Sequence, residues 1–157
     1  MSFSDNKIDL RLLELSDKLI ISEFDGIKYV TDPVRKKKLI LQPEEMVRQL
    51  LILWFIEKTT INRNSLQVEK LIDVNHLSRR FDIVVYNREI QPYILVECKA
   101  SAVPVSQNTF DQIASYNSVL RAPYLMVSNG HTTWFAHQDE ANKQYTFYSE
   151  IPEWLLK

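Results

Sequence analysis

Two short apolar runs with a polar turn between them constrain the fold of this chain more than any other feature. Residues 82–86 and 93–98 are rich in Val, Ile, Leu and Tyr, whereas residues 87–92 include turn formers that a strand interior tolerates poorly. The pattern predicts a β-hairpin, because β-branched and aromatic residues favour strands. We therefore expect the rest of the chain to be organised around two antiparallel strands.

The predicted hairpin brings two acidic residues face to face. If it is symmetric about the middle of its turn, Asp82 lies opposite Glu97. Directly opposed side chains have Cβ atoms roughly 5 Å apart, and like charges at that separation destabilise a sheet. Strand alternation places Lys99 on the face of Glu97 and turns Cys98 toward a core. Two acids and a lysine should therefore meet at one face, and carboxylate oxygens are the ligands that Mg²⁺ prefers.

A surface salt bridge is the alternative interpretation of Asp82, Glu97 and Lys99, because such ion pairs are frequent and contribute little to stability. These three residues alone fit both interpretations equally well. The wider sequence favours the first one. An Asp, a hairpin and then Glu-x-Lys at the end of an apolar strand resemble the PD-(D/E)XK nuclease superfamily.

The resemblance is closer to the nuclease domain at the N-terminus of type I restriction enzyme R subunits and to related stand-alone proteins. The matching segments span most of the chain: residues 43–49, Asp82, residues 97–99, residues 112–116 and residues 128–130. The resemblance implies a restriction-endonuclease-like α/β/α sandwich with a mixed central sheet and flanking helices. It also implies a Mg²⁺-dependent endonuclease that hydrolyses phosphodiester bonds in DNA.

The resemblance assigns roles to the residues at the end of the hairpin. Asp82 and Glu97, helped by the backbone carbonyl of Cys98, would bind one or two Mg²⁺ ions, with Mn²⁺ as a substitute. Lys99 would orient the attacking water or offset the charge that develops on the phosphate. The sequence offers no better nucleophile, because Cys98 is expected to be a buried structural thiol.

Gln112 and Tyr116 lie one turn apart in a predicted helix and match the Gln-x-x-x-Tyr motif of the same domains. The resemblance implies that both reach toward the substrate backbone or toward Lys99. Without it, a solvated glutamine and a tyrosine packed on the edge of the core are the expected interpretation.

A helix is predicted over residues 43–57, with Pro43 in its first turn and two acids at its N-terminus. Steps of 100° per residue place Glu44 at the edge of the buried stripe and Glu45 nearly opposite. Some members of the superfamily add an upstream acid to the metal site. We expect Glu44 in that role, while Glu45 stays open, and an acid that only stabilises the helix N-terminus is an equal alternative.

The remaining patterns predict a mixed sheet. A hairpin is expected over residues 27–41, and residues 8–24 receive no assignment. A strand before the central hairpin completes a three-stranded meander, and a helix capped by Ser106 then leads to a parallel strand. These elements and the two last strands are expected at residues 66–72, 106–120, 124–127, 132–136 and 145–148. We expect one domain over residues 1–157, with a hairpin extension at about 1–42 and a core at about 43–150.

Composition excludes several classes of protein. The 157 residues are 45% hydrophobic and 25% charged, which is ordinary for one globular domain. No run of about 18 apolar residues or apolar N-terminal segment occurs, so we expect a cytoplasmic protein without a membrane partner. The single cysteine cannot form an internal disulfide, and the three histidines lack metal-ligand spacing. With only two glycines, nucleotide-binding glycine loops and an ATP-driven motor are absent.

The net charge of −1 argues against strong non-specific binding of nucleic acid, but local basic patches remain. We expect Arg79 and Arg80 to contact DNA, and Arg35 to Lys38 to form a solvated turn. A homodimer, or further subunits that supply recognition or motor function, are both compatible with the sequence. A catalytically silent module that binds nucleic acid or a partner protein is the alternative function, although such a module has no need for opposed carboxylates.

Overall fold

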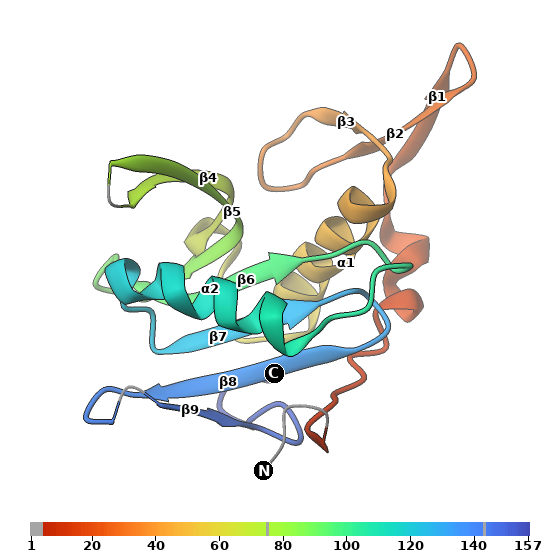
Figure 1. Ribbon diagram of the computed structural model, residues 1–157. Helices are drawn as coiled ribbons and strands as arrows, with labels where there is room; N and C mark the ends of the chain where they lie inside the picture. Colours follow the sequence, from red (N-terminus) through yellow and green to blue (C-terminus); the bar gives the residue numbers. More distant parts are fainter. Residues whose placement is uncertain (1–4, 75, 143) are drawn as a thin grey trace.

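A six-stranded mixed sheet forms the body of the protein in the computed structural model, which describes residues 5–74, 76–142 and 144–157 (Figure 1). Its strands follow the chain order: β4 (Leu66–Val74), β5 (Leu77–Tyr86), β6 (Pro92–Cys98), β7 (Tyr124–Ser128), β8 (Thr133–Asp139) and β9 (Gln144–Phe147). Strands β6 and β7 are parallel, and all other neighbours are antiparallel. The predicted meander and parallel crossover are therefore confirmed.

The two α-helices, α1 (Pro43–Lys58) and α2 (Gln107–Leu120), cover opposite faces of this sheet (Figure 1). On β5, Ile83 and Val85 pack in the core that contains α1, whereas Val84 packs in the core that contains α2. This alternation follows from the period of two along a strand that is buried on both faces. The predicted α/β sandwich with flanking helices is confirmed.

A second sheet lies beside the N-terminal end of α1 (Figure 1). Its three antiparallel strands are β1 (Ile21–Phe24), β2 (Ile27–Thr31) and β3 (Lys38–Ile40). The expected hairpin over residues 27–41 is confirmed as β2 and β3. The unassigned residues 8–24 contain the 3-10 helix η2 (Leu12–Lys18) and β1, and a short 3-10 helix, η3 (Arg63–Ser65), precedes β4.

The central hairpin has the predicted register at its open end, although a bulge shifts the pairing between Val85 and Tyr86. Ile83 pairs with Val96 and Val84 with Leu95, and one further step of this register places Asp82 opposite Glu97. The turn depends on Asn87, whose side-chain oxygen accepts hydrogen bonds from two backbone N–H groups of the turn. An asparagine at this position thereby replaces backbone partners that a tight turn cannot supply.

The burial of the two acids at the start of α1 differs from the expectation. Glu45 is buried and Glu44 is exposed, whereas the helical wheel placed Glu44 beside the buried stripe. The wheel assumes one buried face, but every residue from Val47 to Phe55 is buried. The side of α1 that carries Glu45 is covered by Arg35, from the loop between β2 and β3.

None of the helices in the described part of the chain has the length and apolar content that a membrane span requires.

The C-terminus of α2 is closed by a buried amide. Asn117 donates hydrogen bonds to the carbonyl of Ala122 (2.8 Å) and to the hydroxyl of Tyr145 (3.1 Å), and it accepts one from the Ala122 N–H (2.9 Å). The backbone reverses at Arg121, which adopts a left-handed conformation. The Asn117 side chain thus satisfies backbone groups that the end of a helix would otherwise leave unpaired.

Asn117→Ala should lower the free energy of unfolding by about 2–4 kcal/mol, because it leaves both polar backbone groups of Ala122 buried without partners. Urea denaturation followed by circular dichroism measures this loss. Ser118→Ala, a change on the exposed side of the same helix, should cost about 0.5 kcal/mol or less. Equal losses for the two variants would contradict this role of Asn117.

Candidate active site

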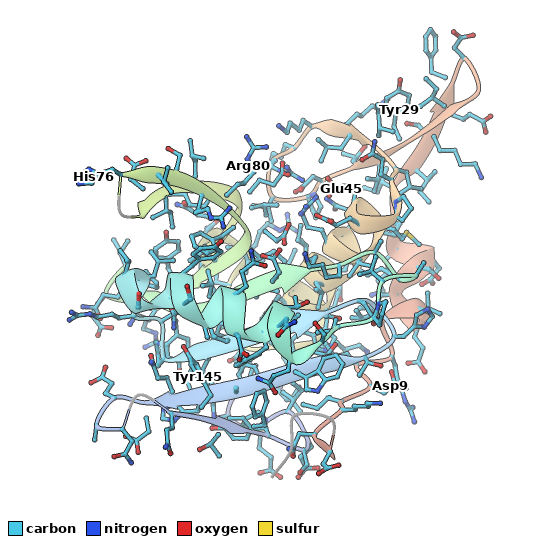
Figure 2. All side chains as sticks on the ribbon, viewed as in Figure 1. Asp9, Tyr29, Glu45, His76, Arg80 and Tyr145 are labelled. Atoms are coloured by element: carbon cyan, nitrogen blue, oxygen red, sulfur yellow. The ribbon has the colours of Figure 1, made fainter. Side chains whose placement is uncertain are left out.

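A pocket of about 230 Å³ opens between β5, the end of β6 and α2. Six of the residues expected at the site line it: Arg79, Arg80, Glu97, Lys99, Gln112 and Tyr116. They come from three elements that are distant in the sequence and adjacent in the fold. Figure 2 shows Arg80 on β5, with α2 below it.

Asp82 lies beside this pocket in a fixed orientation. Its carboxylate accepts a hydrogen bond from the backbone N–H of Cys98 at 2.8 Å and contacts the guanidinium of Arg48. The side chain is buried, so its charge depends on these donors rather than on water. Cys98 itself packs in the core that contains α1, as expected, and burial raises the pKa of its thiol.

Glu97 is the least compensated carboxylate of the site. Lys99 Nζ lies 3.8 Å from Glu97 Oε1, at the outer limit for an ion pair. Burial, followed by the negative charge of Asp82, raises the pKa of Glu97 to about 8, and the charge of Lys99 only partly opposes this shift. Without a further cation, Glu97 therefore carries a proton through most of the neutral range.

Arg48 supplies a counter-charge that the sequence analysis missed. This buried residue of α1 contacts Asp82 at 2.5 Å, Glu45 at 2.8 Å and Glu44 at 3.1 Å. Burial alone would lower the pKa of Arg48, but the charge of Asp82 and the hydrogen bond to it raise this pKa. The available signal was an arginine inside an apolar helical run, because a cation at such a position needs buried acids as partners.

The expected solvated turn at Arg35 is wrong for that residue. Arg35 is only 12% exposed and contacts Asp32 at 2.7 Å and Glu69 at 2.6 Å. Burial alone would raise the pKa of Asp32, but hydrogen bonds from the Arg35 backbone, the Gln49 amide and the Arg35 side chain lower it. The three lysines that follow Arg35 are exposed, as expected.

The two candidate upstream acids have different surroundings. Glu45 contacts Arg35, Arg48 and Gln49. Glu44 contacts Arg48 alone among these, and its pKa is raised by partial burial and by the charge of Asp82. Figure 2 shows Glu45 at the start of α1, near the loop between β2 and β3. Glu44 is thus the acid in electrostatic contact with the site, and its role toward a metal stays a prediction.

The donor chemistry of the site fits a hard cation. Among the described residues, no group of three or more His, Cys, Asp or Glu side chains is placed to hold a metal ion. Two carboxylates nevertheless lie opposite one another across β5 and β6, and Glu97 lacks full compensation. A divalent ion needs few protein ligands when water completes its shell, as is usual for Mg²⁺. Asp82, Glu97 and the Cys98 carbonyl would be those ligands.

Gln112 and Tyr116 meet on the wall of the pocket formed by α2. The Gln112 amide donates to the Tyr116 hydroxyl at 3.3 Å. The Tyr116 ring contacts Phe81 edge to face, with centroids 6.5 Å apart, so it also packs on the second core. On its other side, the guanidinium carbon of Arg79 lies 4.0 Å from the ring centroid.

Comparison with family models found one match that covers most of the chain. Residues 43–152 match the family described as type I restriction enzyme R protein N terminus. The chain belongs to this family. The matched segment begins with the first residue of α1 and includes every residue that lines the pocket, whereas the sheet of β1 to β3 lies before it. A comparison with curated proteins found no match.

The raised pKa of Glu97 predicts a pH-dependent stability of the metal-free protein. A carboxyl group with a folded pKa of about 8 and an ordinary unfolded pKa stabilises the fold fully at low pH. This contribution falls by up to about 1.4 kcal/mol for each unit as pH rises from 5 to 8. Urea denaturation in EDTA across that range measures it.

Glu97→Gln is the matched control, because the amide stays neutral at every pH. As pH rises, the free energy of unfolding of wild type should fall relative to that of Glu97→Gln. Parallel pH profiles for the two proteins would show that Glu97 is ionised throughout.

Proposed function

We propose that this chain is a metal-dependent deoxyribonuclease that hydrolyses phosphodiester bonds of DNA at the pocket between β5, β6 and α2. The observation that carries the proposal is the meeting of Glu97 and Lys99 with Gln112 and Tyr116 at one pocket, beside Asp82. Membership of a family named for type I restriction enzymes supports a role related to restriction. In that setting, DNA is the substrate, and further subunits would supply recognition and motor function.

The residues divide into those that hold a cation and those that act on the phosphate. Asp82, Glu97 and the Cys98 carbonyl would hold Mg²⁺, or Mn²⁺ in its place. The bound ion would polarise the scissile phosphate and lower the pKa of an attacking water. The Cys98 N–H fixes Asp82 before any ligand arrives, so little rotamer freedom is lost on binding.

Lys99 is placed to act on the reacting phosphate. Lys99 lines the pocket, its side chain is 31% exposed, and its ammonium group is only loosely paired with Glu97. A cation there offsets the charge that accumulates on the phosphate oxygens as water attacks and a bridging oxygen leaves. The Gln112 amide, on the opposite wall, can hold the water or a phosphate oxygen by a neutral hydrogen bond.

A silent binding module is the second candidate, and Arg48 is the observation that favours it. Opposed carboxylates need a counter-charge, and Arg48 gives Asp82 one without any metal. Arg48 leaves the pKa of Glu97 raised, however, because burial and the charge of Asp82 oppose ionisation of Glu97. A metal site explains Glu97 and a binding module does not, so we rank the nuclease first.

Glu97→Ala should weaken Mn²⁺ binding at least tenfold, because one of two carboxylate ligands is lost. Titration calorimetry on the purified chain measures the affinity of both proteins. The control is Glu89→Ala, which removes an exposed acid from the turn of the same hairpin. If wild type and Glu97→Ala bind Mn²⁺ equally, the assignment of the site fails.

Lys99→Ala should keep Mn²⁺ affinity within a few-fold and lower the rate of plasmid nicking about 100-fold or more, because its charge acts mainly on the transition state. Lys38→Ala, which removes an exposed lysine from β3, should cut at the wild-type rate. A wild-type chain that cuts neither linear, circular nor single-stranded DNA with Mg²⁺ or Mn²⁺ would favour the silent binding module.

A further inference from the structure

Four arginines surround the site, and they differ in what their guanidinium groups contact. Arg35 and Arg48 each contact three or more carboxylates. The N–H groups of these two guanidinium groups are therefore used in contacts within the protein. No carboxylate of the described residues lies within ion-pairing distance of Arg79 or Arg80, although both line the pocket.

Arg79 is held in place by an aromatic ring instead of an acid. Its guanidinium carbon lies 4.0 Å from the centroid of the Tyr116 ring. A guanidinium group over an aromatic face is attracted by the ring electrons, and its N–H groups can still donate to a ligand. Arg79 is therefore oriented without being neutralised.

The Tyr116 ring is itself fixed. Phe81 contacts it edge to face, and the Gln112 amide donates to its hydroxyl at 3.3 Å. A ring restrained by these two contacts loses little freedom when a cation settles on its face. Gln112 and Phe81 thus restrain Tyr116, and Tyr116 in turn orients Arg79.

We propose that Arg79 binds a phosphate group of the nucleic-acid backbone in this pocket and that Tyr116 is the positioning residue that aims it. The inference rests on the proposed function and deepens it, because it assigns the anionic backbone, not a base, as the group that the pocket takes. Lys99 lines the same pocket and is the second cation for that phosphate.

A backbone phosphate suits the groups that line this pocket. An arginine fork matches the two non-bridging oxygens of a phosphodiester, and a lysine adds a point charge beside them. The pocket volume of about 230 Å³ admits a phosphate with part of its sugar. The hydroxyl of Tyr116 already accepts a hydrogen bond, so its aromatic face is the part that acts on Arg79.

The test is binding of a fluorescent oligonucleotide, single-stranded and duplex, measured by anisotropy over a series of salt concentrations. Each protein is assayed in EDTA and in Ca²⁺, so that no cleavage disturbs the equilibrium. Arg79→Ala should weaken binding several-fold and reduce the slope of log affinity against log salt by about one, the signature of one lost phosphate contact. Arg79→Lys should keep the slope and recover part of the affinity.

Substitutions at Tyr116 separate its ring from its hydroxyl. Tyr116→Phe keeps the face beneath Arg79 and the contact with Phe81 and loses only the hydrogen bond from Gln112, so it should bind DNA more tightly than Tyr116→Leu. Tyr116→Leu removes the face and should weaken binding as much as Arg79→Ala, and the double variant should be no weaker than Arg79→Ala alone. Non-additivity of this kind is expected only if Tyr116 acts through Arg79.

The matched control is Arg88→Ala, which removes the same charge from the turn at the other end of the β5–β6 hairpin. Its salt slope should equal that of wild type. An unchanged affinity and slope for Arg79→Ala, or a wild type that binds neither oligonucleotide, overturns the proposal. If Tyr116→Phe is as weak as Tyr116→Leu, the positioning role of the ring is wrong.

The outcome is independent of whether the chain cuts DNA. Suppose that wild type never cleaves DNA, and that the salt slope of Arg79→Ala is smaller than that of wild type by one. This result refutes the nuclease and supports the phosphate site. A wild type that cleaves, with binding and cleavage both indifferent to Arg79, refutes the phosphate site and leaves the nuclease standing.

Discussion

A buried carboxylate can lie opposite a second one on paired strands only if cations and N–H donors compensate it. Asp82 meets this condition through Arg48 and the Cys98 N–H. Because Arg48 belongs to α1 and Asp82 to β5, the contact that makes the acid pair tolerable also fixes the helix against the sheet. One interaction therefore links the geometry of the site to the packing of α1 against the sheet.

The charges around the site form two groups. In the first group, five carboxylates contact two guanidinium groups: Asp32, Glu44, Glu45, Glu69 and Asp82 against Arg35 and Arg48. On the pocket wall, Arg79, Arg80 and Lys99 accompany a single acid, Glu97. An acidic cluster attracts a cation and a basic pocket wall attracts a polyanion, so a net charge of −1 is compatible with both.

The strands and helices were predictable wherever the local sequence pattern determines the secondary structure. The register of Asp82 against Glu97 matches the prediction, although a bulge near the turn breaks the assumed symmetry of the hairpin. Ser106 marked the start of α2 because it caps that helix. The surroundings of α1 were not predictable, because burial on all sides depends on elements distant in sequence. Arg48 was missed for the same reason. Its partner Asp82 lies 34 residues away, a distance that no helical or strand period connects.

The cluster formed by Asp32, Arg35, Glu45 and Gln49 crosses the border at which the family match begins. A chain that started at Pro43 would keep every residue of the pocket. It would lack Arg35, which contacts Glu45 and Glu69. Arg48 would then be the remaining one of the two arginines that contact these acids. The segment that matches the family therefore excludes Arg35, which shares the compensation of Glu45 and Glu69 with Arg48.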